Sequence, residues 1–137
     1  MIGAAVLAEA RAMVGVPWRH MGRSAAGVDC IGLVLLAASR AGVALPEPAP
    51  YAREPQDHAL RAALGEHLEW VPLDQVQDGD VLLFNMGIYA GHVGIAGTHP
   101  QYGVASVIHA HLPRRCVIEE PRDAFARHLT GAYRWRA

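Results

Sequence analysis

The hydrophobic pattern of the chain changes at Trp70, and this change constrains the fold more than any other feature. Before it, apolar residues recur at the spacing of helices; after it come short apolar or alternating runs typical of strands. Helices followed by a series of strands favour an α+β fold with a largely antiparallel sheet. The predicted helices are 2–14, 29–40 and 58–68, and the predicted strands are 81–84, 92–96, 104–110, 116–119 and 132–135.

Two segments of the first half are predicted to be loops. Gly15–Val28 is interrupted by proline and glycine, and Leu45–Pro55 carries four prolines, so the latter is expected to be an extended surface loop. The chain has no internal repeat and no low-complexity tract. Its 137 residues therefore predict a single domain over residues 1–137.

Composition excludes several classes of protein. Hydrophobic residues make up 52% and charged residues 18%, which excludes a disordered chain. All 12 basic residues are arginine and the net charge is -1, so nucleic acid is not an expected partner. The longest apolar run, Ile31–Ala38, is far shorter than the ~20 residues of a membrane span. The N-terminal segment begins without basic residues and contains Glu9 and Arg11, so we expect no signal peptide.

Cys30 is the first candidate for chemistry. Asp29 occupies the N-cap position of a predicted helix, which places Cys30 in the first turn. Unpaired backbone N–H groups and the helix dipole favour a thiolate there, and cysteines in such positions have pKa values of roughly 3.5–7.5. A buried structural cysteine is the alternative. Cys116, next to Arg114 and Arg115 in a predicted strand, is expected to be structural.

His92 and His109 are candidate partners of this thiol. His92 begins one predicted strand and His109 ends another; paired strands would bring their Cβ atoms to ~4.5–5.5 Å, close enough for the imidazoles to hydrogen-bond. His92 would then accept the thiol proton, and His109 would fix the tautomer of His92.

A zinc site formed by Cys30, His92, His109 and His111 is a further alternative, but no CxxC or HExxH pair is present and we predict no metal.

Four sequence blocks resemble those of NlpC/P60 cysteine peptidases and occur in the order found in that family. Residues 15–34 resemble the catalytic-cysteine segment, GDVLLF at 79–84 resembles a characteristic strand, HVGI at 92–95 the general-base strand, and IHA at 108–110 the strand of the third polar residue. The resemblance implies a papain-like α+β fold, in which N-terminal helices, including the cysteine helix, pack on a mainly antiparallel sheet. It implies Cys30, His92 and His109 as catalytic residues and no cofactor.

Further segments resemble the phage-tail branch of the family, which includes phage cell-wall peptidases and counterparts in gene-transfer-agent clusters. These segments are PWRHMGR at 17–23, Tyr51–Arg53, Pro113–Arg115 and Ala132–Arg134. The branch implies tail proteins as partners. Without a signal peptide, it also implies cytoplasmic synthesis and delivery by a virion or tail to the periplasm or cell wall.

The activity implied by the resemblance is hydrolysis of peptidoglycan stem peptides, commonly between a D-γ-glutamyl residue and a diamino acid. The thiolate would attack the peptide carbonyl and form an acyl-enzyme that water hydrolyses. Two alternatives stay open. One is a thiol-dependent amidase or acyltransferase of the same fold, and the other is a non-catalytic tail or peptidoglycan-binding module.

Several residues around the presumed cleft are candidates for substrate binding. Stem peptides carry free carboxylates, which a guanidinium group binds as a fork, although a solvated loop arginine is an equal alternative. Tyr51 either covers the cleft or packs beneath the Pro-rich loop. The predicted substrate-binding residues are Arg19, Arg23, Trp18, His20 and Tyr51.

The chain departs from the family pattern beside the predicted nucleophile. Ile31 follows the cysteine where many members have serine, and Trp18 and His20 stand where many have tyrosine and tryptophan. These departures leave the peptide preference open, whereas the reaction class rests on the cysteine and the histidines.

Overall fold

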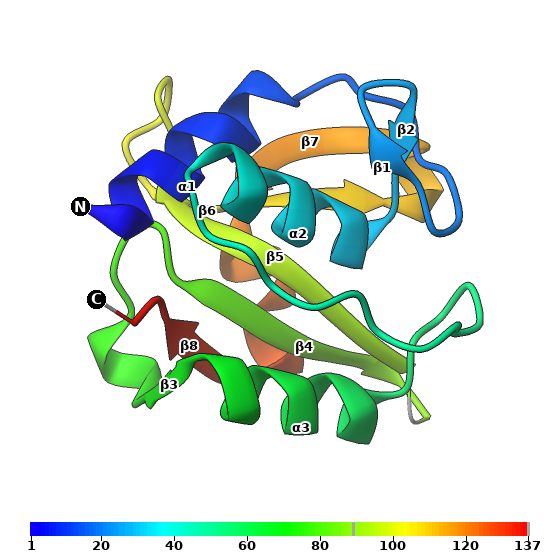
Figure 1. Cartoon of the computed structure of the whole chain (residues 1–137). Coiled ribbons are helices and arrows are strands. Elements are labelled where there is room, and N and C mark those ends of the chain that lie inside the picture. The colour runs from blue at the N-terminus through cyan, green and yellow to red at the C-terminus, as the bar shows by residue number, and fades with distance from the viewer. Residues whose placement is uncertain (89, 137) are drawn as a thin grey trace.

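A six-stranded sheet forms the centre of the computed structural model, which describes residues 1–88 and 90–136 (Figure 1). The strands follow the order β3-β8-β4-β5-β6-β7, and each neighbouring pair is antiparallel. The predicted α+β class and antiparallel sheet are therefore confirmed. The strands of this sheet are β3 (Glu69–Val71), β4 (Val81–Gly87), β5 (Ala90–Thr98), β6 (Ala105–His111), β7 (Cys116–Pro121) and β8 (Leu129–Arg134).

Three helices cover one face of the sheet (Figure 1). They are α1 (Ile2–Ala12), α2 (Cys30–Arg40) and α3 (Asp57–His67), close to the predicted ranges. Their apolar side chains form the main core with the inward-facing strand residues, among them Leu83, Val93 and Ile95. In the part of the chain that the structure describes, no helix has both the length and the apolar character needed to cross a membrane.

The opposite face of the sheet carries a second, smaller core. Alternate residues of the strands point to this side, and Leu82, Phe84 and Val107 pack there with Phe125. Phe125 belongs to η3 (Arg122–His128), a 3-10 helix that the sequence analysis did not predict. Two shorter 3-10 helices are η1 (Leu73–Gln75) and η2 (Leu112–Arg114).

The two segments predicted as loops differ in their structure. Residues 15–28 contain a small hairpin, β1 (Arg23–Ser24) with β2 (Gly27–Val28), so the prediction of a plain loop was incomplete. The Pro-rich segment 45–55 contains neither helix nor strand, as predicted.

The sheet divides at one end, where β5 and β6 separate. β5 pairs with β6 only from Ile95 to Thr98, whereas its first half pairs with β4 and, at Ala90, forms a single bridge with Gln56. Beyond Ile108, β6 continues in register with β7. We call this separation of β5 from β6 the fork. The first turn of α2 lies over it (Figure 1), so the fold brings the start of a helix to the point where two strands part.

Candidate active site

Asp29 fixes the start of α2 and of the segment before it. Its Oδ1 accepts the Gly32 N–H at 2.8 Å, which confirms the predicted N-cap. Its Oδ2 accepts the Met21 N–H at 2.8 Å and the Tyr51 hydroxyl at 2.6 Å. Asp29 is buried, and both of its carboxylate oxygens accept hydrogen bonds from these groups. It therefore holds Cys30 in place rather than acting as an acid.

Cys30 lies in the first turn of α2, against β5. The Val93 N–H is within hydrogen-bonding reach of its sulfur and, with the N–H groups of Cys30 and Ile31, favours the thiolate. Burial acts in the opposite direction and is larger, and together with the charge of Asp29 it raises the pKa of Cys30 to about 12. The expected low pKa is therefore wrong for this structure, because the thiol is only 5% exposed. The resting group is a neutral thiol.

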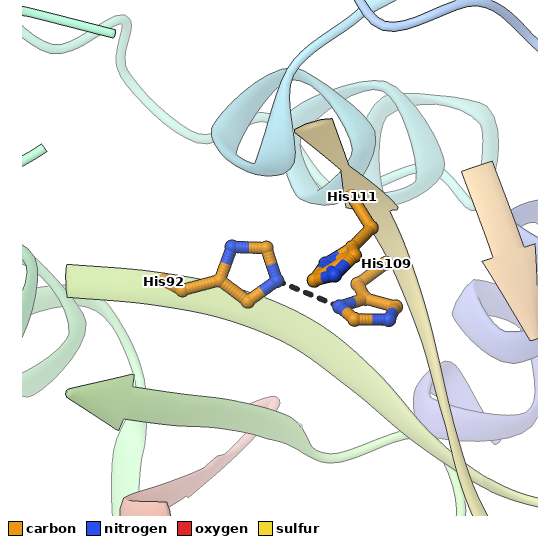
Figure 2. A group of neighbouring side chains, drawn as sticks. All are labelled: His92, His109 and His111. Atoms are coloured by element: carbon orange, nitrogen blue, oxygen red, sulfur yellow. Dashed lines mark hydrogen bonds between the residues drawn. The ribbon is translucent and has the colours of Figure 1, made fainter. Parts of the chain in front are cut away.

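His92 and His109 meet at the fork, from β5 and β6. Nε2 of His92 lies 2.7 Å from Nδ1 of His109, and Figure 2 shows the two rings facing each other. The predicted hydrogen bond between the imidazoles is thus present. It forms where the strands no longer pair, so side chains rather than the backbone bridge the gap.

Glu120 on β7 extends this contact and determines the tautomers. Its Oε2 lies 2.7 Å from Nε2 of His109. A carboxylate only accepts, so His109 carries its proton on Nε2 and offers the Nδ1 lone pair to His92. His92 then donates from Nε2, which leaves its Nδ1 without a proton, on the side of the ring toward α2 (Figure 2).

Glu120 was not predicted from the sequence. β7 pairs with β6 so that Val107 faces Glu120, and the glutamate reaches His109 diagonally on the same face of the sheet. The sequence gives only a weak signal for this role of Glu120. It is the second of two acidic residues in a short strand, and the sequence does not show which strand that one pairs with.

His111 lies beside this pair on the same face of β6. Its ring centroid is 4.7 Å from that of His109 and 6.1 Å from that of His92. Burial and the neighbouring imidazoles lower the pKa of His92 well below its usual value and that of His109 to about 3. Burial also lowers the pKa of His111, and Arg114 adds to this whereas Glu120 opposes it. All three imidazoles are neutral near pH 7.

Gly94 on β5 makes the close approach to β6 possible. A Cβ atom there would lie 2.6 Å from Val107 Cγ2, 3.0 Å from the Ile108 oxygen and 3.1 Å from His109 Cβ. The glycine of the HVGI block therefore has a packing reason: it makes room for the His109 side chain.

Arg23, predicted to bind substrate, is engaged within the protein. Its guanidinium group lies 2.8 Å from Glu47, 3.2 Å from Asp29 and 2.9 Å from the Tyr51 hydroxyl. With the Gly22 carbonyl oxygen at 2.9 Å, four groups of the protein already accept hydrogen bonds from this guanidinium group, and its role in substrate binding stays a prediction. Arg19 is exposed in the loop before β1 and stays a candidate.

Trp18, His20 and Tyr51 form a contiguous aromatic group. The ring centroids of Trp18 and His20 are 6.5 Å apart, and His20 meets the Tyr51 ring edge-on at 5.7 Å. Tyr51 also reaches Asp29, the residue before the thiol. The structure thus gathers the three predicted aromatic residues near the start of α2.

An apolar pocket of about 550 Å³ lies beneath the Pro-rich segment, between α2 and α3. Its lining includes Ile31 and Val93, the neighbours in sequence of Cys30 and His92, together with Tyr51. Leu60 and Leu64 of α3 form part of its other wall. This pocket therefore favours apolar groups, and it lies beside the residues that follow Cys30 and His92 in the sequence.

Known proteins share this sequence pattern and this fold. The family described as NlpC/P60 matches residues 15–134. A probable endopeptidase of Mycobacterium tuberculosis is 36% identical over 105 residues, which is 73% of this chain but 24% of that protein, so the chain spans about a quarter of its curated relative.

Two solved structures have the same fold at lower identity. The NlpC/p60 domain of the peptidoglycan hydrolase SagA has a TM-score of 0.70 at 23% identity, covering 96% of this chain and 97% of that one. RipD of M. tuberculosis, a non-catalytic NlpC/p60 protein adapted to peptidoglycan binding, has a TM-score of 0.64 at 19% identity, covering 98% and 97%. The blocks around Cys30, His92 and His109 and the architecture that assembles them agree with the match over residues 15–134: this chain belongs to the NlpC/P60 family.

Proposed function

We propose that this protein is a cysteine peptidase that hydrolyses the stem peptides of peptidoglycan. The observation that carries the proposal is the hydrogen-bonded series His92–His109–Glu120, which leaves Nδ1 of His92 without a proton, while the Cys30 sulfur lies within hydrogen-bonding reach of the N–H of Val93, the next residue on β5. The named activities of the relatives support it: one is a probable endopeptidase and one a peptidoglycan hydrolase.

The reaction begins from a neutral pair. Nδ1 of His92 accepts the Cys30 proton as the sulfur attacks the peptide carbonyl, and the imidazolium then gives this proton to the leaving amine. His109 and Glu120 stabilise the transient positive charge on His92 through their hydrogen bonds. The backbone N–H of Cys30 is a candidate donor to the oxyanion, a contribution often of about 3–4 kcal/mol. Water then hydrolyses the acyl-enzyme by the same exchange of protons.

Exposed side chains of the loop before β1 and the apolar pocket would hold the substrate. Arg19 is an exposed arginine that would bind a stem-peptide carboxylate, and Trp18 and His20 offer surfaces beside it. The pocket beside Ile31 accepts an apolar part of the substrate. The D-γ-glutamyl–diamino acid bond and an association with phage or gene-transfer-agent tails that carries the enzyme to the cell wall rest on the sequence resemblance.

Two other functions deserve separate tests. A peptidoglycan-binding protein without turnover is favoured by RipD, which has this fold and is non-catalytic. A thiol-dependent amidase or acyltransferase would use the same sulfur and imidazoles with another acyl donor. The products distinguish the three, because a peptidase separates stem residues whereas an amidase releases the whole stem from the sugar.

Digestion of purified muropeptides, read by mass spectrometry, tests the proposal. We expect cleavage between stem residues by the wild type and a loss of at least about 10³-fold in Cys30→Ala, because the nucleophile is absent. Cys116→Ala is the matched control, since Cys116 is the other free cysteine and lies on β7 opposite His111 rather than in the first turn of α2, and it should keep its rate. Turnover by Cys30→Ala near the wild-type rate, or no cleavage by the wild type, would contradict the proposal.

A further inference from the structure

The proposed mechanism assigns no role to the imidazole of His111. His92, His109 and Glu120 account for the proton transfer, yet His111 lies against both histidines and is partly exposed. Figure 2 shows the three rings converging from β5 and β6 on the same space at the fork.

The nitrogen atoms of the three rings are arranged like a set of metal ligands. One nitrogen from each of His92, His109 and His111 lies within 4.8 Å of the other two. Tetrahedral zinc with bonds of about 2.0–2.1 Å holds nitrogens about 3.4 Å apart, so rotations of the side chains suffice to close the set. The carboxylate on the far nitrogen of His109 reproduces the carboxylate–histidine–metal arrangement that orients such ligands.

We propose that His92, His109 and His111 bind a divalent transition-metal ion of the Zn²⁺ class, and that this ion reversibly inhibits the enzyme. Three imidazoles without an oxygen ligand select zinc, copper or nickel over magnesium and calcium. His92 and His111 are partly exposed, which gives the ion an entry path. Arg114 lies near and opposes a cation, whereas Glu120 compensates for it.

The inhibition rests on the proposed function. It follows from where the protons lie on the imidazole rings of His92 and His109. Nδ1 of His109 carries no proton, so its lone pair, which accepts from His92 in the absence of metal, can bind the ion while Nε2 of His109 keeps its proton and donates to Glu120. Nε2 of His92 must give up its proton to bind, and this proton moves to Nδ1, so the net charge of the ring does not change. Three metal–nitrogen bonds replace three metal–water bonds, and the hydrogen bond between His92 and His109 breaks. The nitrogen that would accept the Cys30 proton is then occupied.

Binding is measured first, in a variant that cannot hydrolyse. Cys30→Ala, freed of metal, is titrated with Zn²⁺ by calorimetry and with Co²⁺ by visible absorption, so that the Cys30 thiolate does not contribute. We expect one ion per chain, and at least about tenfold weaker binding when His111→Gln is added, because a ligand is lost. His58→Gln, on the exposed surface of α3, is the matched control and should not change the affinity. Absent binding, or equal affinity in the two double variants, overturns the inference.

Inhibition is measured next, with muropeptides as substrate. Zn²⁺ should stop hydrolysis by the wild type, a chelator should restore it, and His111→Gln should need at least about tenfold more Zn²⁺ for the same inhibition. A metal-free enzyme that hydrolyses and does not respond to Zn²⁺ overturns the inference and leaves the proposed function intact. A protein that binds the ion at these histidines but never hydrolyses overturns the proposed function and keeps the site.

Discussion

Cys30 is subject to two opposing influences, and their balance determines the form of the proposed catalytic pair. The start of α2 and the Val93 N–H favour the thiolate, whereas burial favours the thiol and prevails. The imidazole of His92, the proposed base, is also kept neutral by burial. A neutral thiol with a neutral base requires proton transfer at the moment of attack, so the tautomer of His92 matters more here than in a preformed ion pair. The hydrogen bonds of His109 and Glu120 set that tautomer.

Substitutions along this series should reduce the rate in a fixed order. His109→Ala removes the partner of His92 and should lower kcat about 10²–10³-fold, within the usual range for general acid–base groups. Glu120→Gln keeps the shape but not the charge, and we expect a loss of about tenfold. His111→Ala should have the smallest effect, because His111 lies outside the series.

Steady-state kinetics with a muropeptide checks this order, and circular dichroism checks that each variant is folded. A larger loss for His111→Ala than for His109→Ala would show that the wrong histidine of the HxH pair was chosen as the partner of His92.

Local sequence patterns predicted most helices and strands. The features that they missed depend on strand pairing between distant parts of the chain. α1, α2 and α3 were predicted because helical periodicity and caps are readable in a short window. β3 was missed because a strand of three residues carries no alternation. The fork was missed as well, since it depends on where β5 stops pairing with β6.

Gly94→Ala tests whether the close packing of β5 on β6 positions the site. The added methyl would press on Val107 and on the backbone beside His109, so we expect a destabilisation of about 1–3 kcal/mol and a lower kcat. Gly65→Ala in α3 is the matched control: its Cβ meets open space, and helix propensity should stabilise it by up to about 1 kcal/mol. Denaturant unfolding and kinetics measure both variants, and wild-type stability and rate in Gly94→Ala would refute the packing argument.

Across the whole molecule, sequence motifs selected the candidate reacting groups but not the contacts that hold them. Cys30, His92 and His109 were selected together because their blocks occur in a known order, and the structure brings the two imidazoles into contact. Arg23 was assigned to substrate because it lies in the loop before Cys30. Its ion pair with Glu47 was missed, because Glu47 lies in the Pro-rich segment, whose position the sequence does not reveal. Glu120 was missed for the same reason.

The neutral histidines make the stability of the whole protein depend on pH. The pKa of His109 is about 3 in the folded chain against an ordinary 6.5, so the unfolded chain binds more protons between these values. The free energy of unfolding should therefore fall as pH falls below about 6.5, by up to about 1.4 kcal/mol per pH unit for each such group. His109→Asn should flatten this dependence, and His58→Asn on the surface of α3 should not. Urea titrations from pH 7 to 4.5 measure it, and equal slopes in wild type and His109→Asn would contradict the assignment.

The position of Glu120 on β7 has a consequence for the timing of activity during synthesis. The thiol comes from residue 30 and the anion that orients the relay comes from residue 120, near the other end of the chain. A nascent chain that has been synthesised only as far as β6 contains the sulfur and the imidazoles but lacks the Glu120 carboxylate. Its His92 ring can then carry the proton on Nδ1, the nitrogen that is proposed to accept the thiol proton. Under the proposed function, the ability to hydrolyse therefore arises only after β7 has docked, and a truncated or half-folded chain would be inactive.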